Sequence, residues 1–213
     1  DLKKAGLTRV NISLDTLNME KYRRITRGGD LNKALNGIKA AREAGLTPIK
    51  INTVLIGGFN EDEITDLINL TMEHQIDIRF IELMPIGEAV GFAKDKFISN
   101  SRVLETVPNL ISVEAEDRSS PARYFRLPGA KGKVGIINPI SCKFCSNCNR
   151  VRLTSTGKLK LCLHSNREIE LRDAMRNEED ISSIIKEAIY SKEKEHHLEN
   201  DEFITRNMNQ IGG

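Results

Sequence analysis

The 213-residue chain carries 32 Lys and Arg against 30 Asp and Glu, so its formal net charge is only +2, and 39% of its residues are hydrophobic. This length suits one large or two small domains with a real core, and the near-neutral charge argues against nucleic acid as a partner. No window approaches the run of about 18 uncharged apolar residues that a membrane span needs. The opening residues, DLKKAGLTRV, contain no initiator Met and no apolar signal core. We therefore expect a cytoplasmic protein without a membrane partner, whose thiols stay reduced and whose sequence starts as if mid-protein.

The first part of the chain alternates strands with helices. Strands are predicted at residues 9–15, 49–56 and 78–84, and helices at residues 31–45 and 61–74. Asp30 is expected to cap the first of these helices and Gly45 to end it. The alternation predicts an α/β fold of parallel strands with helical crossovers, as in a doubly wound sheet or a (β/α) barrel.

The strands have one apolar and one polar face. In the first strand, Ile12 and its apolar neighbours alternate with Asn11, Ser13 and Asp15, and in the second Ile51 alternates with Lys50. A doubly wound sheet is covered on both faces, so a polar face fits better the lumen of a barrel that holds a polar ligand. Three strands cannot close a barrel. We therefore expect residues 1–91 to be the last strands of an incomplete (β/α) barrel.

After Gly91 the periodicity changes from helical to alternating. Short antiparallel strands are predicted at residues 110–116, 122–127, 133–140, 149–154 and 158–163, followed by helices at 167–177 and 178–197. Residues 92–213 are thus expected to form an α+β C-terminal domain. His164 is expected on its surface, and His196 and His197 in a solvated, charged helical run.

All four cysteines lie between residues 142 and 162. A hairpin turning at Thr156–Gly157 would bring Cys162 close to Cys148, and strand alternation would place Cys148 on the same face as Arg150 and Arg152. The compact C-x2-C-x2-C run with one remote partner is unlike a zinc ribbon, yet the spacing alone leaves both an iron–sulfur cluster and zinc open. Disulfides are disfavoured in a reducing compartment.

The cysteines stand in a basic segment. Residues 131–163 contain no Asp or Glu and carry seven cationic side chains: Lys131, Lys133, Lys143, Arg150, Arg152, Lys158 and Lys160. Such a segment is expected to attract an anion. The simpler alternative is that it forms a solvated basic face without a ligand.

The residues around the cysteines carry a resemblance. The run F-C-x2-C-N-R-x-R-L-T, from Phe144 to Thr154, followed by Cys162, resembles the C-terminal signature of the GTP 3',8-cyclase family, which are radical S-adenosylmethionine enzymes of molybdenum cofactor biosynthesis. The stretches RVNISLDT, PIKIN and IRFIELMPIG resemble late barrel strands of that family. NMNQIGG resembles its double-glycine C-terminus.

The resemblance implies a set of site residues. Cys145, Cys148 and Cys162 would hold a second 4Fe-4S cluster whose fourth iron is open to the substrate. GTP would be bound by Lys50, Arg150, Val151 and Arg152. The binding site of S-adenosyl-L-methionine would be lined by Ser13 and Met84. Gly212 and Gly213 would form an active-site tail. No residue is assigned a catalytic role.

Two departures from the family pattern matter. Cys142 has no counterpart in the pattern, and we expect it to be a bystander, because a fourth ligand would close the open iron. The family's C-x3-C-x2-C loop, which holds the cluster that cleaves S-adenosylmethionine, does not occur in this sequence. We therefore expect a C-terminal part of the enzyme that is inactive alone, with GTP, the missing N-terminal part and a second copy in a homodimer as partners.

Two other classes of function compete with this interpretation. One is a zinc-stapled nucleic-acid-binding module, which the absence of Trp and only 5% aromatic residues weaken. The other is a small iron–sulfur electron carrier. A brown protein prepared without oxygen excludes zinc, and a spectral change on adding GTP separates a substrate site from a carrier.

Overall fold

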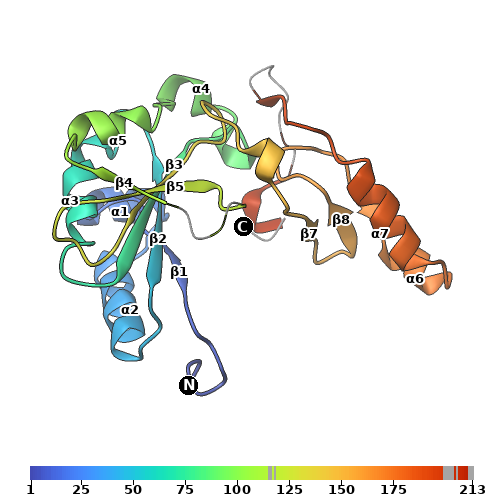
Figure 1. The fold of residues 1–213 in the computed structure, drawn as a ribbon, viewed down its shortest axis with the longest axis horizontal. Helices are drawn as coiled ribbons and strands as arrows, with labels where there is room; N and C mark the ends of the chain where they lie inside the picture. The colour runs from blue at the N-terminus through green and yellow to red at the C-terminus, as the bar shows by residue number, and fades with distance from the viewer. Residues whose placement is uncertain (115–116, 118, 199–203, 205, 211–213) are drawn as a thin grey trace. The chain divides into compact units, whose positions relative to one another are not determined.

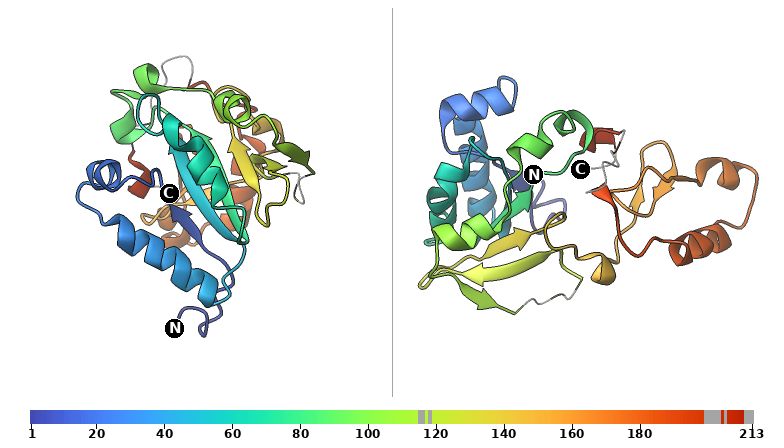
Figure 2. Two further views of the ribbon diagram at one scale, coloured as in Figure 1. Left: turned by 90° about the vertical axis from the view of Figure 1, so that its left-hand side faces the viewer. Right: turned by 90° about the horizontal axis from the view of Figure 1, so that it is seen from above.

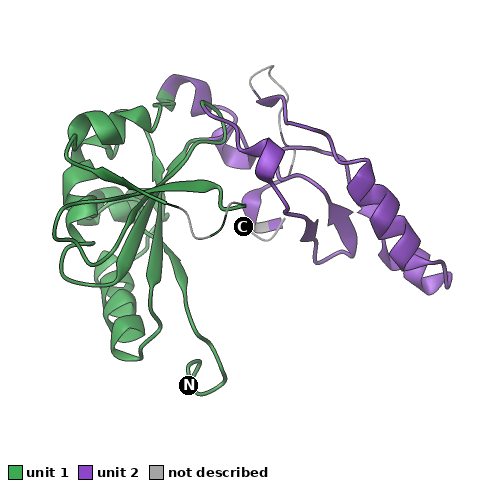
Figure 3. Ribbon diagram, viewed as in Figure 1, with its two compact units in different colours: residues 1–83, 96–141 green, residues 84–95, 142–213 purple. Residues whose placement is uncertain are grey.

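The computed structural model describes residues 1–114, 117, 119–198, 204 and 206–210. They form a six-stranded sheet with helices and a smaller three-stranded sheet (Figures 1 and 2). Their contacts divide the chain into two compact units (Figure 3). The first unit is Asp1–Leu83 with Lys96–Ser141, and the second is Met84–Asp95 with Cys142–Gly213.

The sheet of the first unit is rich in parallel strands. Its order is β1 (Asn11–Ser13), β2 (Ile49–Leu55), β3 (Ile76–Glu82), β6 (Val134–Ile137), β5 (Ala122–Arg126) and β4 (Ile111–Val113). The first four are parallel neighbours, and β5 and β4 are added antiparallel. The predicted α/β fold is confirmed at this level. The prediction of an all-antiparallel second part is wrong for β6, which pairs parallel with β3 and so joins the first sheet.

The helices of the first unit pack on one face of this sheet (Figure 2). They are α1 (Met19–Ile25), α2 (Leu31–Glu43), the 3-10 turn η1 (Glu61–Glu63), α3 (Ile64–Asn69) and α5 (Ser101–Thr106). As predicted, the Asp30 side chain caps α2, accepting the Asn32 N–H at 2.9 Å, and Gly45 follows the end of the helix with φ +69°. The helix predicted at 61–74 is shorter, because α3 ends at Asn69.

The core confirms the predicted parity of the strands. Ile49 and Ile51 of β2 are fully buried against α2 and α3, whereas Lys50 and Asn52 between them are only half-buried. Asn11 and Ser13 of β1 are exposed. One face of the sheet is therefore apolar and covered by helices, and polar side chains line the other.

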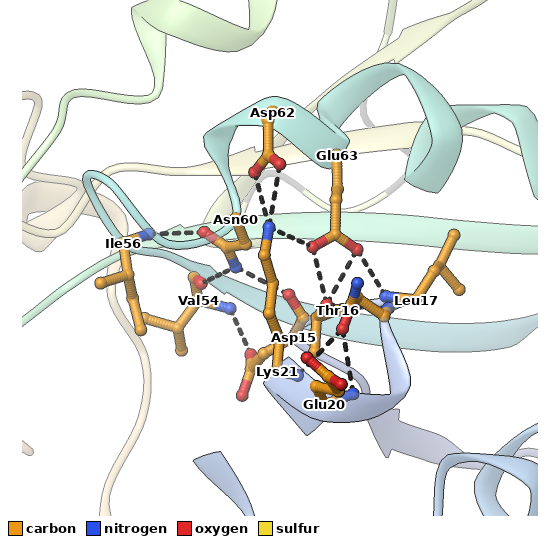
Figure 4. Close-up of polar contacts among 11 residues, drawn as sticks. Asp15, Thr16, Leu17, Glu20, Lys21, Val54, Ile56, Asn60, Asp62 and Glu63 are labelled. Carbon is orange, nitrogen blue, oxygen red and sulfur yellow. Dashed lines mark hydrogen bonds and ion pairs between the residues drawn. The ribbon is translucent and has the colours of Figure 1, made fainter. Parts of the chain in front are cut away.

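A buried carboxylate joins the segments that follow β1 and β2 (Figure 4). Glu63 accepts the Thr16 hydroxyl at 2.7 and 2.8 Å, the Leu17 N–H at 2.6 Å and the Lys21 ammonium at 2.9 Å. Asn60 in turn donates to the carbonyls of Asp15 and Val54. Charge-assisted hydrogen bonds of this kind are stronger than neutral ones, so they fix the backbone at this end of the sheet.

The second unit is built on a small antiparallel sheet. Its elements are η2 (Gly87–Ala89), most of α4 (Ala93–Lys96), η3 (Cys145–Asn147), β7 (Arg152–Leu153), β8 (Lys158–Lys160), β9 (Ile169–Glu170), α6 (Arg172–Arg176), α7 (Ile181–Tyr190) and η5 (Met208–Gln210). Leu159 and Leu161 pack with Leu171 and with Ala188 of α7 in a separate small core. In the described part of the chain, no helix is long and apolar enough to cross a membrane.

Some predicted bounds in this unit are wrong. The helix predicted at 167–177 begins only at Arg172, because Ile169 and Glu170 pair with β8 as β9. The helix predicted at 178–197 ends at Tyr190. The contact units also differ from the predicted domains, 1–91 and 92–213, because β4 to β6 belong to the first sheet. A functional boundary at residue 91 stays a prediction.

Candidate functional site

Three of the four cysteines come together in the second unit. Cys145 opens η3, and the Cys148 N–H donates to the Cys145 carbonyl at 3.1 Å. Because side chains three residues apart in a 3-10 turn are nearly eclipsed, these two thiols lie near each other. Both interact electrostatically with the thiol of Cys162, which lies just past the end of β8. The fold thus gathers residues that are up to seventeen positions apart in the sequence.

Cys142 differs from these three in its exposure. All four cysteines are free thiols, but Cys142 is exposed while Cys145, Cys148 and Cys162 are half-buried. The electrostatic partners of Cys162 include Cys145 and Cys148. The exposure agrees with the bystander role expected for Cys142, whose part in ligation stays a prediction.

The environments of Cys148 and Cys162 shift their pKa values in opposite directions. Burial raises the pKa of Cys162, and the neighbouring Cys145 adds to this, while the His164 N–H lowers it. Burial also acts to raise the pKa of Cys148, but the Arg150 N–H and the Lys192 ammonium outweigh it, so that this pKa lies below its ordinary value. Cys148 is therefore biased toward the thiolate, the form that binds metal.

The chemistry of these three cysteines suits an iron–sulfur cluster. Thiolates are the usual ligands of such clusters, and the three sulfurs lie half-buried on one turn and the end of an adjoining strand. In the described part of the chain, no three His, Cys, Asp or Glu side chains lie close enough together to hold one metal ion, so ligation by these three cysteines stays a prediction. The gathered thiols are the donors that the second unit offers for a cluster.

The predicted hairpin is confirmed. β7 and β8 pair antiparallel, with Arg152 opposite Lys160, and the Thr154 N–H donates to the Lys158 carbonyl at 2.9 Å. Gly157 turns the chain at φ +80°, where a Cβ would lie only 2.6 Å from the Cβ of Arg172. A residue without a side chain is required there, and this tight turn returns the chain toward Cys148.

The two arginines of the resemblance lie at the start of this hairpin. Val151 is 43% exposed, Arg150 is also exposed, and Arg152 is half-buried at the first position of β7. The strand alternation predicted from Cys148 to Arg152 is wrong before Arg152, because Asn149 to Val151 are not in a strand. The Arg150 side chain instead interacts with the Cys148 thiol directly.

Much of the basic segment has partners in the second unit. Lys160 is 1% exposed and donates to the Ser165 carbonyl, and burial lowers its pKa. Lys158 pairs with Glu170 at 3.5 Å, and Lys143 pairs with Glu195 at 3.6 Å. A uniformly solvated basic face is therefore wrong. Lys131 in the first unit is exposed, and in the second unit Arg150 is exposed next to the thiols.

Met84 lies against a buried histidine pair. The Met84 sulfur is 2.9 Å from Nε2 of His164, whose ring meets that of His196 edge-on with 4.4 Å between centroids. His164 is 8% exposed and His196 3%, so the predicted surface and solvated positions are wrong. Burial, together with the nearby His196, lowers the pKa of His164 to about 3. This histidine is neutral at physiological pH. His164 follows Leu163 and His196 stands beside His197 in a charged run, and neither sequence context signals burial.

Ser13 and Lys50 lie in the first unit, on the polar face of the sheet. Lys50 is opposite Asn11, and Ser13 is opposite Asn52. The sequence reasoning did not single out Arg79 on the same face, which donates to Asn52 at 2.8 Å and to Asn11 at 3.0 Å. Its register partner on β6 is Gly135, where a Cβ would lie 3.0 Å from the Arg79 side chain. Strand parity with Asp77 could have identified Arg79 as a member of this polar face. Gly212 and Gly213 lie outside the described residues.

Comparison with known proteins defines first the class of protein. The chain matches the radical SAM superfamily over residues 1–71 and Molybdenum Cofactor Synthesis C over residues 76–198. The polar residues of β1 and β2 fall in the first match, and Arg79 of β3 and the three half-buried cysteines fall in the second. The protein is thus of the radical SAM class and is associated with molybdenum cofactor biosynthesis.

The chain belongs to the Molybdenum Cofactor Synthesis C family. It is 60% identical over 214 residues to the GTP 3',8-cyclase of Peptoclostridium acidaminophilum and 59% identical over 215 residues to that of Alkaliphilus oremlandii. It is 49% identical to a GTP 3',8-cyclase of Clostridium botulinum. Each alignment covers all of this chain and 66 to 67% of the relative, so the chain spans about two thirds of the length of these relatives. These matches confirm the resemblance drawn from the cysteine–arginine signature.

Proposed function

We propose that this chain supplies the substrate-binding part of a GTP 3',8-cyclase, which converts GTP to (8S)-3',8-cyclo-7,8-dihydroguanosine 5'-triphosphate in molybdenum cofactor biosynthesis. The observation that carries the proposal is the group of three half-buried thiols next to the exposed Arg150, in a chain 60% identical to a protein of that name. The location we propose is the reducing cytoplasm.

Cys145, Cys148 and Cys162 would hold a 4Fe-4S cluster. With three protein ligands, the cluster would supply one iron position for the guanine of the substrate. The lowered pKa of Cys148 favours the ligating thiolate. Cys142, being exposed, is left out of the ligand set.

Arg150, Val151, Arg152 and Lys50 would bind GTP. A guanidinium offers a rigid planar fork that matches phosphate oxygens, and Arg150 is exposed at the thiols where substrate would arrive. Val151 would contribute its backbone between the two arginines. Lys50 stands on the polar sheet face, where a cation can meet a charged ligand.

Ser13 and Met84 would line the site of S-adenosyl-L-methionine, which supplies a carbon radical when cleaved. In this proposal β1, β2 and β3 are strands of a radical SAM (β/α) barrel, an assignment supported by parallel pairing and by helices on the apolar face alone. Gly212 and Gly213 would form the active-site tail, and a homodimer stays a prediction.

The chain of 213 residues would be inactive by itself, because its sequence lacks a C-x3-C-x2-C loop. Reconstituted with iron and sulfide, it is expected to release no 5'-deoxyadenosine from S-adenosylmethionine above a protein-free control. Release of 5'-deoxyadenosine would show that radical generation needs no further cysteine loop.

The deciding experiment adds GTP to the chain reconstituted without oxygen. A brown protein whose cluster spectrum changes with GTP, and not with an equal concentration of inorganic triphosphate, supports a guanine-binding cluster. A colourless protein that binds zinc would instead favour the nucleic-acid-binding alternative. A brown protein whose cluster spectrum does not change with GTP would favour the electron carrier.

A further inference from the structure

Lys192 makes three contacts at the cysteine–arginine segment of the second unit. Its ammonium lies 2.9 Å from the Arg150 carbonyl, 3.1 Å from the Cys148 carbonyl and 3.6 Å from the Cys148 sulfur. An ammonium has three protons to donate, so these three acceptors match its capacity. The contacts span more than forty positions of the sequence, so no local pattern predicts them.

The fold delivers Lys192 to this place. It follows α7 by two residues, and the α7 residues Ala188, Ile184 and Ile185 pack on the core that includes Leu159 of β8. The Lys192 N–H donates to the Ile189 carbonyl at 3.2 Å, and Arg167 donates to the carbonyl of Ser191 at the same distance. These two hydrogen bonds fix the backbone at Ser191 and Lys192.

Lys192 has a different environment from the other lysines near the thiols. Lys143 and Lys158 each pair with a glutamate, and Lys160 is turned to the Ser165 carbonyl. Lys192 and Cys162 line the same small pocket, with Ser165 and Arg167. Its charge thus lies among the candidate cluster ligands and touches one of them.

We propose that Lys192 is a positioning residue for the cluster and substrate: it donates to the Cys148 sulfur and ties the carbonyls of Cys148 and Arg150 together. This rests on the proposed function, since it takes Cys148 as a ligand and Arg150 as a substrate contact. By holding both carbonyls, the ammonium fixes the backbone between Cys148 and Arg150, and so the position of the Cys148 sulfur relative to the Arg150 guanidinium. The ammonium also offsets the negative charge that three thiolates bring to one place.

The proposal predicts a redox signature. Hydrogen bonds to cluster sulfurs and nearby positive charge favour the reduced, more negative state of a cluster and so raise its reduction potential. Lys192→Met keeps the length of the side chain and removes both effects. Lys192→Arg keeps the charge and the donors. Lys186→Met removes a charge of the same kind from an exposed position on α7 and is the matched control.

The test measures iron content, the midpoint potential by anaerobic titration followed by electron paramagnetic resonance, and GTP affinity on the reconstituted chain. Lys192→Met is expected to shift the potential to more negative values and to weaken GTP binding roughly tenfold. Lys192→Arg should keep most of the wild-type potential and most of the wild-type GTP affinity. Lys186→Met should match the wild type in both. Loss of iron in Lys192→Met with retention in Lys192→Arg would equally support the proposal.

Other outcomes overturn it. An unchanged potential in Lys192→Met, or equal loss of iron in Lys192→Met and Lys192→Arg, would show that the ammonium does not serve the cluster. A wild-type chain that takes up a cluster and responds to GTP while Lys192→Met behaves like Lys186→Met would defeat this inference alone. A wild-type chain without a GTP-responsive cluster would defeat the proposed function as well.

Discussion

The carboxylate of Glu82 accepts the backbone N–H of Ser141 at 2.9 Å, 59 positions further along the chain. It also accepts the Ile140 N–H at 3.0 Å and the Ser141 hydroxyl, and Glu82 itself is fully buried. A buried carboxylate is costly unless hydrogen-bonded, and here the end of β3 supplies the acceptor for the loop after β6. This loop leads directly to the cysteines in the sequence.

Removing this carboxylate is expected to destabilise the first unit strongly. Glu82→Ala leaves two part-buried backbone N–H groups and a hydroxyl without their acceptor, which should lower the free energy of unfolding by about 2–4 kcal/mol. Urea unfolding of wild type and variant measures this. Glu105→Ala is the control, because Glu105 is exposed and its pair with Arg102 at 3.6 Å is also exposed, so a change within about 0.5 kcal/mol is expected. Equal stability of the two variants would contradict the anchoring role.

Asp15 gives the protein a stability that depends on pH. Burial raises the pKa of Asp15 above its ordinary 3.8, although the Val54 N–H, which donates to it at 2.8 Å, acts the other way. The folded form therefore binds a proton more readily than the unfolded form, and the stability contributed by Asp15 is lost as the pH rises through the folded pKa. Asp15→Asn keeps an oxygen acceptor for Val54 and has no charge to bury. Asp15→Asn should therefore have a higher melting temperature than the wild type at pH 7. The difference should vanish below a pH of about 4, where the carboxyl of Asp15 is protonated in both the folded and the unfolded chain. A lower melting temperature of the variant at pH 7 would refute this.

The four cysteines are expected to differ in their effect on iron content. A cluster held by Cys145, Cys148 and Cys162 predicts about four irons per chain, retained in Cys142→Ala because that thiol is exposed. Cys145→Ala, Cys148→Ala and Cys162→Ala should each lose most of the iron. Iron analysis after anaerobic reconstitution decides the question. Equal loss in Cys142→Ala would mean a fully ligated cluster without an open iron.

The arginines are expected to affect GTP without affecting iron. In the complete enzyme, Arg150→Lys and Arg152→Lys keep the charge but lose the planar fork, so they should weaken GTP binding, and Arg→Ala at either position should cost about 1.5–3 kcal/mol, or roughly tenfold to a hundredfold. Anaerobic GTP titration and iron counts on the same samples check this. Arg172→Lys, at an exposed position on α6, is the matched control. Unchanged GTP affinity with an intact cluster would show that Arg150 and Arg152 do not clamp the substrate.

Local features of the fold followed from the sequence alone. The alternation of Ile49, Lys50 and Ile51 predicted which side of β2 is buried, because side chains of a strand point to opposite faces. Asp30 predicted where α2 begins, since a short acceptor side chain satisfies free N–H groups of the first turn. Gly157 predicted the hairpin that brings Cys162 back toward Cys148. Each of these depends on a few neighbouring residues, so a short window of sequence contains the cause.

Only the tertiary structure decided which distant segments meet. Nothing local to Val134–Ile137 reveals that β6 pairs parallel with β3, because strand order depends on the packing of the whole sheet. The burial of His164 and His196 was equally hidden, since a polar residue is buried only where the fold supplies a partner, here Met84 and the other ring. The same reason applies to Lys192. Its sequence context is an ordinary charged run, and packing of α7 on β8 is what places its ammonium at the Cys148 sulfur.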